Sequence, residues 1–115
     1  MLLADVEGFV SVRRWLMKLS KKSGSEQTRR NYLLCLRRFC EYACLTPDGL
    51  VEEREREIGS SDRFMRRRAE EKLDEWFAFL NETGSARTGK KYARNMLVSA
   101  YNAVRSFHYY FFSRF

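Results

Sequence analysis

The stretch SEQTRRNYLLCLRRFC, residues 25–40, decides the fold that the sequence predicts. Its apolar side chains recur every three or four residues, which places Tyr32, Leu36 and Phe39 on one face of an α-helix. Ser25 stands just before this pattern and is a candidate N-cap, because a serine oxygen can accept a hydrogen bond from the first helical turn. We therefore predict a helix that begins at the start of this stretch.

The polar start of this helix occurs twice in the chain. SEQTRRNY at residues 25–32 and SARTGKKY at residues 85–92 both fit Ser-x-x-Thr-x-x-x-Tyr, with basic residues between the Thr and the Tyr. The N–H groups of a first helical turn lack intrahelical partners and lie at the positive end of the helix dipole, so they attract anions. We expect each octet to begin a helix and bind a phosphate. The alternative is helix capping alone, with the tyrosine in the core.

Other segments complete an all-α fold. Residues 4–20 and 62–81 show helical periodicity, and so does the segment from residue 85 to near the C-terminus. Residues 50–60 are acidic and polar, and we expect a short, poorly packed helix or a loop there. No stretch shows the sustained alternation of a strand. The sequence therefore predicts one all-α domain over residues 1–115, with four main helices.

Positive charge is concentrated around the two octets. The chain carries a net charge of +7, to which residues 11–38 contribute +8, residues 84–115 contribute +6 and residues 47–62 contribute −4. A polyanion is the natural partner for such concentrated positive charge, and nucleic acid is the commonest polyanion. A basic surface without a specific partner is the alternative.

The spacing of the basic residues places them away from the predicted core. At about 100° per residue, Arg30 and Arg37 oppose Tyr32 on the second predicted helix, and a second stripe opposes Tyr92 on the fourth. An α-helix fits the DNA major groove, where Arg and Lys reach phosphates and guanine edges, so we expect these faces to bind DNA. Ordinary solvated faces are the alternative. The stripe on the fourth helix consists of Arg87, Lys90, Arg94, Tyr101 and Arg105.

Two motifs resemble those of a known family. The run Ser-x-x-Thr-x-x-x-Tyr-x-x-x-Leu-x-x-Phe-x-x-Tyr, from Ser25 to Tyr42, resembles the second helix of the core-binding domain of tyrosine recombinases, the phage-integrase and Xer-like family. The segment from Ser85 to Tyr110, which ends Val-Arg-Ser-Phe-His-Tyr-Tyr, is similar to the last long helix of that domain. The resemblance covers residues 5–112, nearly the whole chain.

The resemblance implies a fold and a partner. The family's core-binding domain is a small SAM-like domain of four helices, arranged as two crossed helical hairpins, and it forms one half of a C-shaped clamp on double-stranded DNA. The N-terminal parts of its second and fourth helices meet the duplex. With Arg37 added from the outer face of the second helix, the candidate DNA-binding residues are Thr28, Arg29, Arg30, Arg37, Arg87, Thr88, Lys90, Lys91 and Arg94.

The family's catalytic half has no counterpart in this sequence. That half carries an Arg, a Lys, a His-x-x-Arg motif and a nucleophilic Tyr, whereas the only histidine here, His108, is followed by Tyr109-Tyr110-Phe111. A tyrosine nucleophile needs cations to stabilise the phosphoryl transition state. We therefore expect no DNA cleavage, no catalytic residue and no cofactor. The chain would then be either the N-terminal domain of a recombinase or a stand-alone relative. Residues 47–62 also look longer and more acidic than the family pattern.

Other interpretations stay open at this point. One helix cannot bury aromatic rings on every side, so residues 107–115 indicate contact with a catalytic domain of the same parent protein or with neighbouring protomers. A frayed tail is the alternative for this segment. A helical protein–protein interaction module without nucleic acid is the alternative function, and binding of the basic-aromatic helix to a membrane surface is a third.

The cysteines and the apolar segments bear on metal binding and localisation. Cys35, Cys40 and Cys44 form an odd, clustered set, which argues against a secreted disulfide framework. Only His108 could join them from a distance, and a structural zinc site takes four ligands, so we expect small core residues and no metal. The sequence shows no signal peptide and no apolar run near the ~20 residues that span a membrane. A complete chain would therefore be cytoplasmic.

Overall fold

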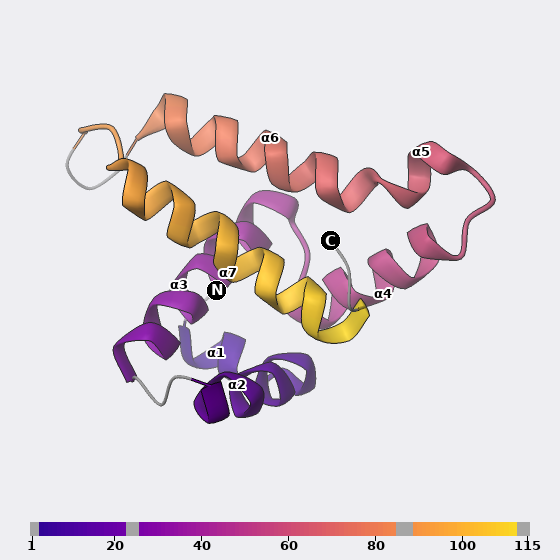
Figure 1. The fold of residues 1–115 in the computed structure, drawn as a ribbon, viewed down its shortest axis with the longest axis horizontal. Helices are drawn as coiled ribbons and strands as arrows, with labels where there is room; N and C mark the ends of the chain where they lie inside the picture. The colour runs from indigo at the N-terminus through magenta and orange to yellow at the C-terminus, as the bar shows by residue number, and fades with distance from the viewer. Residues whose placement is uncertain (1–2, 23–25, 85–88, 113–115) are drawn as a thin grey trace.

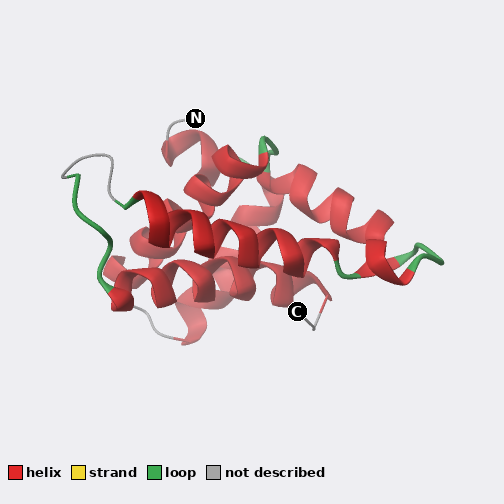
Figure 2. Cartoon of the chain, turned by 90° about the horizontal axis from the view of Figure 1, so that it is seen from above, coloured by secondary structure: helices red, strands yellow, loops and turns green. Residues whose placement is uncertain are grey.

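The computed structural model describes residues 3–22, 26–84 and 89–112 of the chain. Every regular element in these ranges is an α-helix, so the predicted all-α class is confirmed. Figure 2 shows these helices in red, with the described turns and loops between them in green. The helices are α1 (Leu3–Glu7), α2 (Val10–Lys22), α3 (Glu26–Ala43), α4 (Pro47–Ile58), α5 (Arg63–Arg66), α6 (Arg68–Thr83) and α7 (Arg94–Phe112).

Two of the predicted helices are broken. The helix predicted over residues 4–20 is interrupted at Gly8 and Phe9, whose N–H groups donate to carbonyls three residues earlier at 3.1 and 3.3 Å. The helix predicted over residues 62–81 is interrupted at Arg67, whose φ of −102° and ψ of 2° lie outside the helical region. The periodicity therefore identified both helical segments but not the breaks, because one distorted residue leaves the apolar spacing nearly unchanged.

Helix α4 is better packed than the sequence predicts. The Thr46 side chain caps it by accepting a hydrogen bond from the Gly49 N–H at 3.0 Å, and Pro47 occupies the first turn, where a missing N–H costs nothing. Leu50 and Arg54 are buried on its inner side. The expectation of a short, poorly packed helix or a loop over residues 50–60 is therefore wrong. It failed because charged residues that bury their side chains in ion pairs look solvent-exposed in a sequence.

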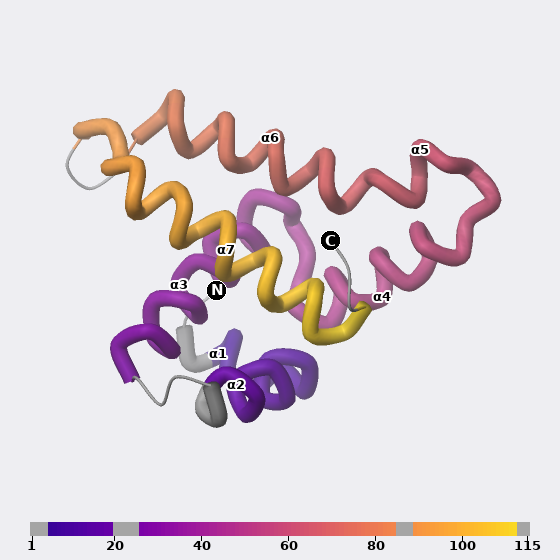
Figure 3. Tube along the Cα trace, in the orientation of Figure 1, coloured from indigo at the N-terminus to yellow at the C-terminus, as the bar shows by residue number. Residues whose placement is uncertain are grey.

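The long helices are arranged around α7. Figure 1 shows that α6 and α7 run antiparallel and that α3 crosses α7, and α3 packs against α7 more extensively than any other pair of described helices. The tube in Figure 3 shows the chain turning at the end of α4 and returning through α5 into α6. The turn at this end and the loop before α7 lie at opposite ends of the long axis, which measures 43 Å.

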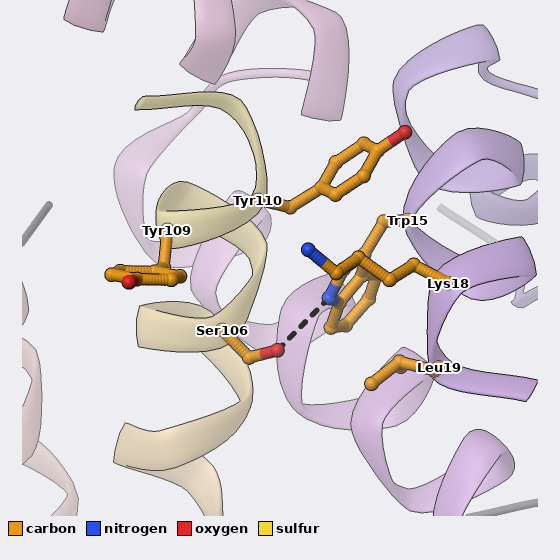
Figure 4. Close-up of a pocket in the computed structure, with 6 residues that line it drawn as sticks. All are labelled: Trp15, Lys18, Leu19, Ser106, Tyr109 and Tyr110. Atoms are coloured by element: carbon orange, nitrogen blue, oxygen red, sulfur yellow. Dashed lines mark hydrogen bonds between the residues drawn. The ribbon is translucent and has the colours of Figure 1, made fainter. Parts of the chain in front are cut away.

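Large aromatic side chains hold the core together. The Trp15 ring meets the edge of Phe107 with centroids 5.3 Å apart, and Phe39 meets Trp76 at 5.2 Å, so these contacts join α2 to α7 and α3 to α6. Figure 4 shows the Trp15 indole N–H donating to the Ser106 hydroxyl, at 3.1 Å. Burial of such rings with satisfied polar atoms is a main source of stability in a small domain.

Candidate nucleic-acid interface

The first octet lies at the start of α3, as predicted. Helix α3 begins at Glu26, and Ser25, the candidate cap, lies outside the described residues. Arg30 is exposed, whereas Thr28 is half-buried. The Arg29 guanidinium lies 3.5 Å from the Glu26 carboxylate and 4.0 Å from a carboxylate oxygen of α1. Two acidic groups therefore partly neutralise this helix start, and Arg30 is its most accessible cation.

Two arginines in the middle of α3 make contacts that restrain them. Arg37 lies 3.7 Å from the carboxylate of Glu41, one turn later, and is half-buried. The Arg38 guanidinium lies over the Tyr92 ring, 5.9 Å from its centroid, in a cation–π contact. This contact joins the second octet to α3. Arg38, which was not among the predicted DNA-binding residues, therefore contacts the last residue of the second octet.

The second octet does not begin a helix. Helix α7 begins at Arg94, beyond the end of the octet, so the prediction that the fourth helix starts at Ser85 is wrong. Ser85, Arg87 and Thr88 lie outside the described residues. The physical reason is visible on either side of them, because Gly84 and Gly89 have φ of +68° and +69°, a left-handed conformation that ends helices.

Close backbone packing shapes the loop before α7. A Cβ added to Gly84 would come within 2.6 Å of the Lys90 carbonyl oxygen, so the end of α6 and the start of the second basic segment touch backbone to backbone. Only glycine, which lacks a Cβ, permits this approach. The loop therefore holds Lys90 and its neighbours directly against the C-terminal end of α6.

The accessible cations of the second octet lie at one end of the molecule. Lys90, Lys91 and Arg94 are exposed, and the first turn of α7 contains no acidic residue. Figure 1 shows the starts of α3 and α7 toward the same end of the long axis, on opposite sides of the molecule in that view, and Arg30 belongs to the first part of α3. The structure therefore gathers four of the nine predicted residues as exposed cations at one end.

The predicted outer stripe of α7 is only partly open. Arg94 and Arg105 are exposed on the helix, but Tyr101 packs edge-on against Phe77 of α6 and its hydroxyl lies 3.5 Å from the Asp74 carboxylate. Burial raises the pKa of the Tyr101 phenol, and the Asp74 charge adds to this effect. A groove of about 390 Å³ between α6 and α7 is lined by these side chains. Tyr101 of the predicted stripe is therefore packed against α6 and lies beside an acidic residue of that helix.

An exposed basic cluster at α5 was missed in the sequence. Four arginines stand in the six residues RFMRRR at positions 63–68, and all four are exposed. Figure 1 shows α5 at the opposite end of the molecule from the start of α7. The charge density of these six residues was a sufficient signal, but it was hidden because acidic residues on both sides lower the net charge of longer windows.

A buried ion-pair cluster between α4 and α6 was also missed. Arg54 and Glu57 are only 2% and 3% exposed, and the Arg54 guanidinium lies 3.8 Å from Glu57 and 3.6 Å from Glu70. Arg54 also donates to the Arg66 carbonyl oxygen at 2.7 Å, which ties α4 to the end of α5. Burial raises the pKa of the Glu57 carboxyl. The cluster holds the α4–α5–α6 turn together, at the opposite end of the molecule from the start of α7.

His108 lies beside this cluster in the core. It is 3% exposed, its Nδ1 atom lies 3.0 Å from the Val104 carbonyl oxygen, and its ring meets the edges of Phe39 and Phe107. Burial lowers the pKa of the imidazole to about 4, and the positive charge of Arg54 adds to the shift. The only histidine of the chain is therefore a neutral core residue that no DNA phosphate could reach.

The C-terminal aromatic residues are mostly packed. Phe107 is fully buried, and Tyr110 and Phe111 are half-buried against the core, whereas Tyr109 is 54% exposed and points away from the other side chains in Figure 4. The expectation that part of this helix is exposed is confirmed for Tyr109. Residues 113–115 lie outside the described part of the chain.

The cysteines do not form a metal site in the described ranges. Cys35 and Cys40 are buried, and burial raises the pKa of the Cys40 thiol to about 12, whereas Cys44 is exposed. Among the residues that the structure describes, no group of three or more His, Cys, Asp or Glu side chains could hold a metal ion. In the same part of the chain, no helix is both long and apolar enough to cross a membrane.

Comparisons with known proteins do not identify a relative. No protein-family model, no curated protein and no solved structure matches the chain. The resemblance of the two octets to tyrosine recombinases therefore stays a prediction from sequence motifs. The function is argued below from the position and charge of the described side chains.

Proposed function

We propose that this protein binds double-stranded DNA through the end of the molecule where α3 and α7 begin. The observation that carries the proposal is the group of exposed cations Arg30, Lys90, Lys91 and Arg94 at that end. Phosphate contacts from Lys and Arg supply most of the affinity of DNA-binding proteins, and helix starts orient backbone N–H groups toward phosphates. The acid-free first turn of α7 is the better of the two helix starts, because Glu26 occupies the first turn of α3.

We further propose that the fold corresponds to the core-binding domain of a tyrosine recombinase. The four longest helices, α2, α3, α6 and α7, are the counterparts of its two crossed hairpins, with α4 and α5 as an enlarged connection. The antiparallel course of α6 and α7 and the crossing of α3 over α7 support this assignment. The family resemblance of the two octets is its other support.

The proposed role is binding without strand cleavage. A tyrosine nucleophile needs cationic partners around the scissile phosphate, and the one histidine of the chain is buried in the core. This burial of His108 supports a purely non-catalytic role. A DNA substrate with a strand break beside the cleavage site should trap no covalent adduct, whereas recovery of a phosphotyrosine-linked complex would contradict the proposal.

A titration of duplex DNA at several salt concentrations tests the proposal. The logarithm of the association constant should fall linearly with the logarithm of salt concentration, by about 0.9 for each phosphate neutralised. The triple variant Lys90→Ala/Lys91→Ala/Arg94→Ala should bind at least about tenfold more weakly at low salt. The salt dependence of its binding should be less steep than that of the parent, by the equivalent of up to about three phosphate contacts. Its melting temperature should change little, because exposed substitutions usually cost less than about 0.5 kcal/mol.

A matched control separates position from charge. The variant Arg63→Ala/Arg66→Ala/Arg68→Ala loses the same three charges at the opposite end of the molecule, where all three side chains are exposed. On a short duplex that binds only one protein molecule, this control variant should keep most of the parent's affinity and nearly the same salt dependence. Equal losses in both triple variants would place the interface elsewhere, and affinity that does not depend on salt would refute phosphate binding.

A further inference from the structure

Residues 63–68, in and just after α5, form an exposed surface that is both basic and apolar. Phe64 is 73% exposed, more than any other large hydrophobic side chain in the described residues, and Met65 beside it is 43% exposed. Exposed arginines surround this pair, and of these Arg67 makes a peripheral ion pair with Glu70 at 4.0 Å. An exposed phenylalanine ringed by cations indicates a partner that offers an apolar recess with an acidic rim. We define the basic knob as Arg63, Phe64, Met65, Arg66, Arg67 and Arg68.

An open acidic groove lies between α2, α4 and the end of α7, with a volume of about 280 Å³. Val10, at 51% exposure, contributes apolar surface with two half-buried neighbours. Glu52 and Glu55 are exposed at its edge. We define the acidic groove by its apolar lining, Val10, Val51 and Phe111, and its carboxylates, Asp48, Glu52 and Glu55.

The carboxylates of the groove differ in availability. Asp48 accepts hydrogen bonds from the Ser11 N–H, at 3.1 Å, and from the Ser11 hydroxyl, so it is engaged within the chain. Arg14 also lines the groove and offsets one negative charge. Glu52 and Glu55 therefore carry the net negative charge that a positively charged partner would meet.

The knob of one molecule cannot fill its own groove. The Arg54 side chain on the inner side of α4 donates to the Arg66 carbonyl oxygen, which holds α5 on that side of the helix. The groove is lined by Val51, Glu52 and Glu55, which lie on another side of α4. Only residues 59–62 join the two helices, and such a short turn cannot carry α5 around α4.

We propose that the basic knob of one molecule docks in the acidic groove of a second copy of this chain. The Phe64 ring enters beside Val10, and the arginines of the knob face Glu52 and Glu55. Neither patch can pair with itself, because like charges would meet, so the contact is between unlike surfaces. This inference does not depend on DNA binding.

Two single charge reversals and their mixture test the proposal by sedimentation velocity without DNA. The parent should form particles of at least twice the monomer mass as its concentration rises, and this association should weaken with salt. Arg66→Glu reverses a positive charge of the knob, and Glu55→Arg reverses a negative charge of the groove. Each variant alone should therefore self-associate at least about tenfold more weakly than the parent. Their equimolar mixture should associate again, because one variant keeps an intact groove and the other an intact knob.

Controls make each outcome decisive. Arg13→Glu introduces the same charge change at an exposed position of α2 and should leave the self-association of the parent unchanged. A parent that stays monomeric at every accessible concentration would overturn the proposal, and so would a mixture that associates no better than either variant. If Arg66→Glu leaves the mass distribution unchanged and instead weakens binding to a short duplex, the knob is a DNA contact and not a self-association surface. Since the mass measurement contains no DNA, its failure would leave the proposed function untouched.

Discussion

Acid should destabilise this protein through His108, the only histidine in its 115 residues. The imidazole is buried among aromatic rings of α3 and α7, and Arg54 and Lys72 add positive charge on the side of α4 and α6. Its pKa falls from 6.5 to about 4 in the folded protein. Between pH 6.5 and about 4, the unfolded chain therefore binds a proton at this histidine and the folded protein does not. The free energy of unfolding falls as the pH is lowered through this range.

The size of this loss follows from the change in pKa. Each pH unit between the unfolded and folded values contributes about 1.4 kcal/mol, so the complete loss is about 3 kcal/mol, and about 2 kcal/mol of it is reached at pH 5. In a domain of this size, 2 kcal/mol corresponds to a fall of about 8 °C or more in the melting temperature. Above pH 6.5 the histidine should contribute no pH dependence, because it is neutral in both states.

A neutral replacement isolates the contribution of His108 from the rest of the charge. In His108→Asn the side-chain amide can still donate to the Val104 carbonyl oxygen, but it has no proton to gain. Urea unfolding followed by circular dichroism at pH 7, 6, 5 and 4.5 should show the parent losing stability relative to the variant by about 2 kcal/mol by pH 5. General charge repulsion acts on both proteins and cancels in the difference.

Proton NMR provides a direct second measurement. Because the chain has one histidine, its ring C–H resonances belong to a single group and their titration midpoint can be read without assignment. The midpoint in the folded protein should lie near 4, well below that of the unfolded chain. A midpoint close to 6.5, or parallel stability curves for the parent and His108→Asn, would refute the buried, neutral histidine and with it the placement of α7 against α4 and α6.

Three further predictions concern stability. Arg54→Ala should lower the free energy of unfolding by about 3–5 kcal/mol in urea titrations, because it leaves Glu57 buried without its cation, and a loss below about 1 kcal/mol would contradict the buried ion pair. Gly84→Ala should cost about 1–3 kcal/mol in thermal unfolding, since alanine is strained at a φ of +68° and its Cβ would clash with the loop before α7; a neutral effect would show that this close approach is wrong. Ser106→Ala removes the hydroxyl that accepts from the Trp15 indole, so the unfolding free energy should fall by about 1 kcal/mol while DNA affinity stays unchanged.

The charge of the candidate interface could be predicted, because charge is fixed by residue type. Lys90, Lys91 and Arg94 do not belong to an apolar stripe, and they are exposed as expected. Helix α3 begins within the first octet, as predicted. The Arg37–Glu41 pair is one helical turn apart, so its spacing could have been recognised in the sequence, whereas the contact of Arg29 with Glu7 of α1 could not. Repetition of the octet was also misleading, because Gly84 just before the second copy and Gly89 within it have positive φ, and α7 begins only at Arg94.

The sequence by itself determined the helical class, the course of the apolar stripes and the concentration of positive charge, because each depends on residues within a few turns of one another. Only the tertiary structure decided which charged groups are buried, where α7 begins and which cations share one end of the molecule. Arg54, Glu57 and His108 look like surface residues along the chain but meet between α4, α6 and α7. The physical reason is that burial, ion pairing and close backbone approach are set by residues far apart in sequence, which no local pattern specifies.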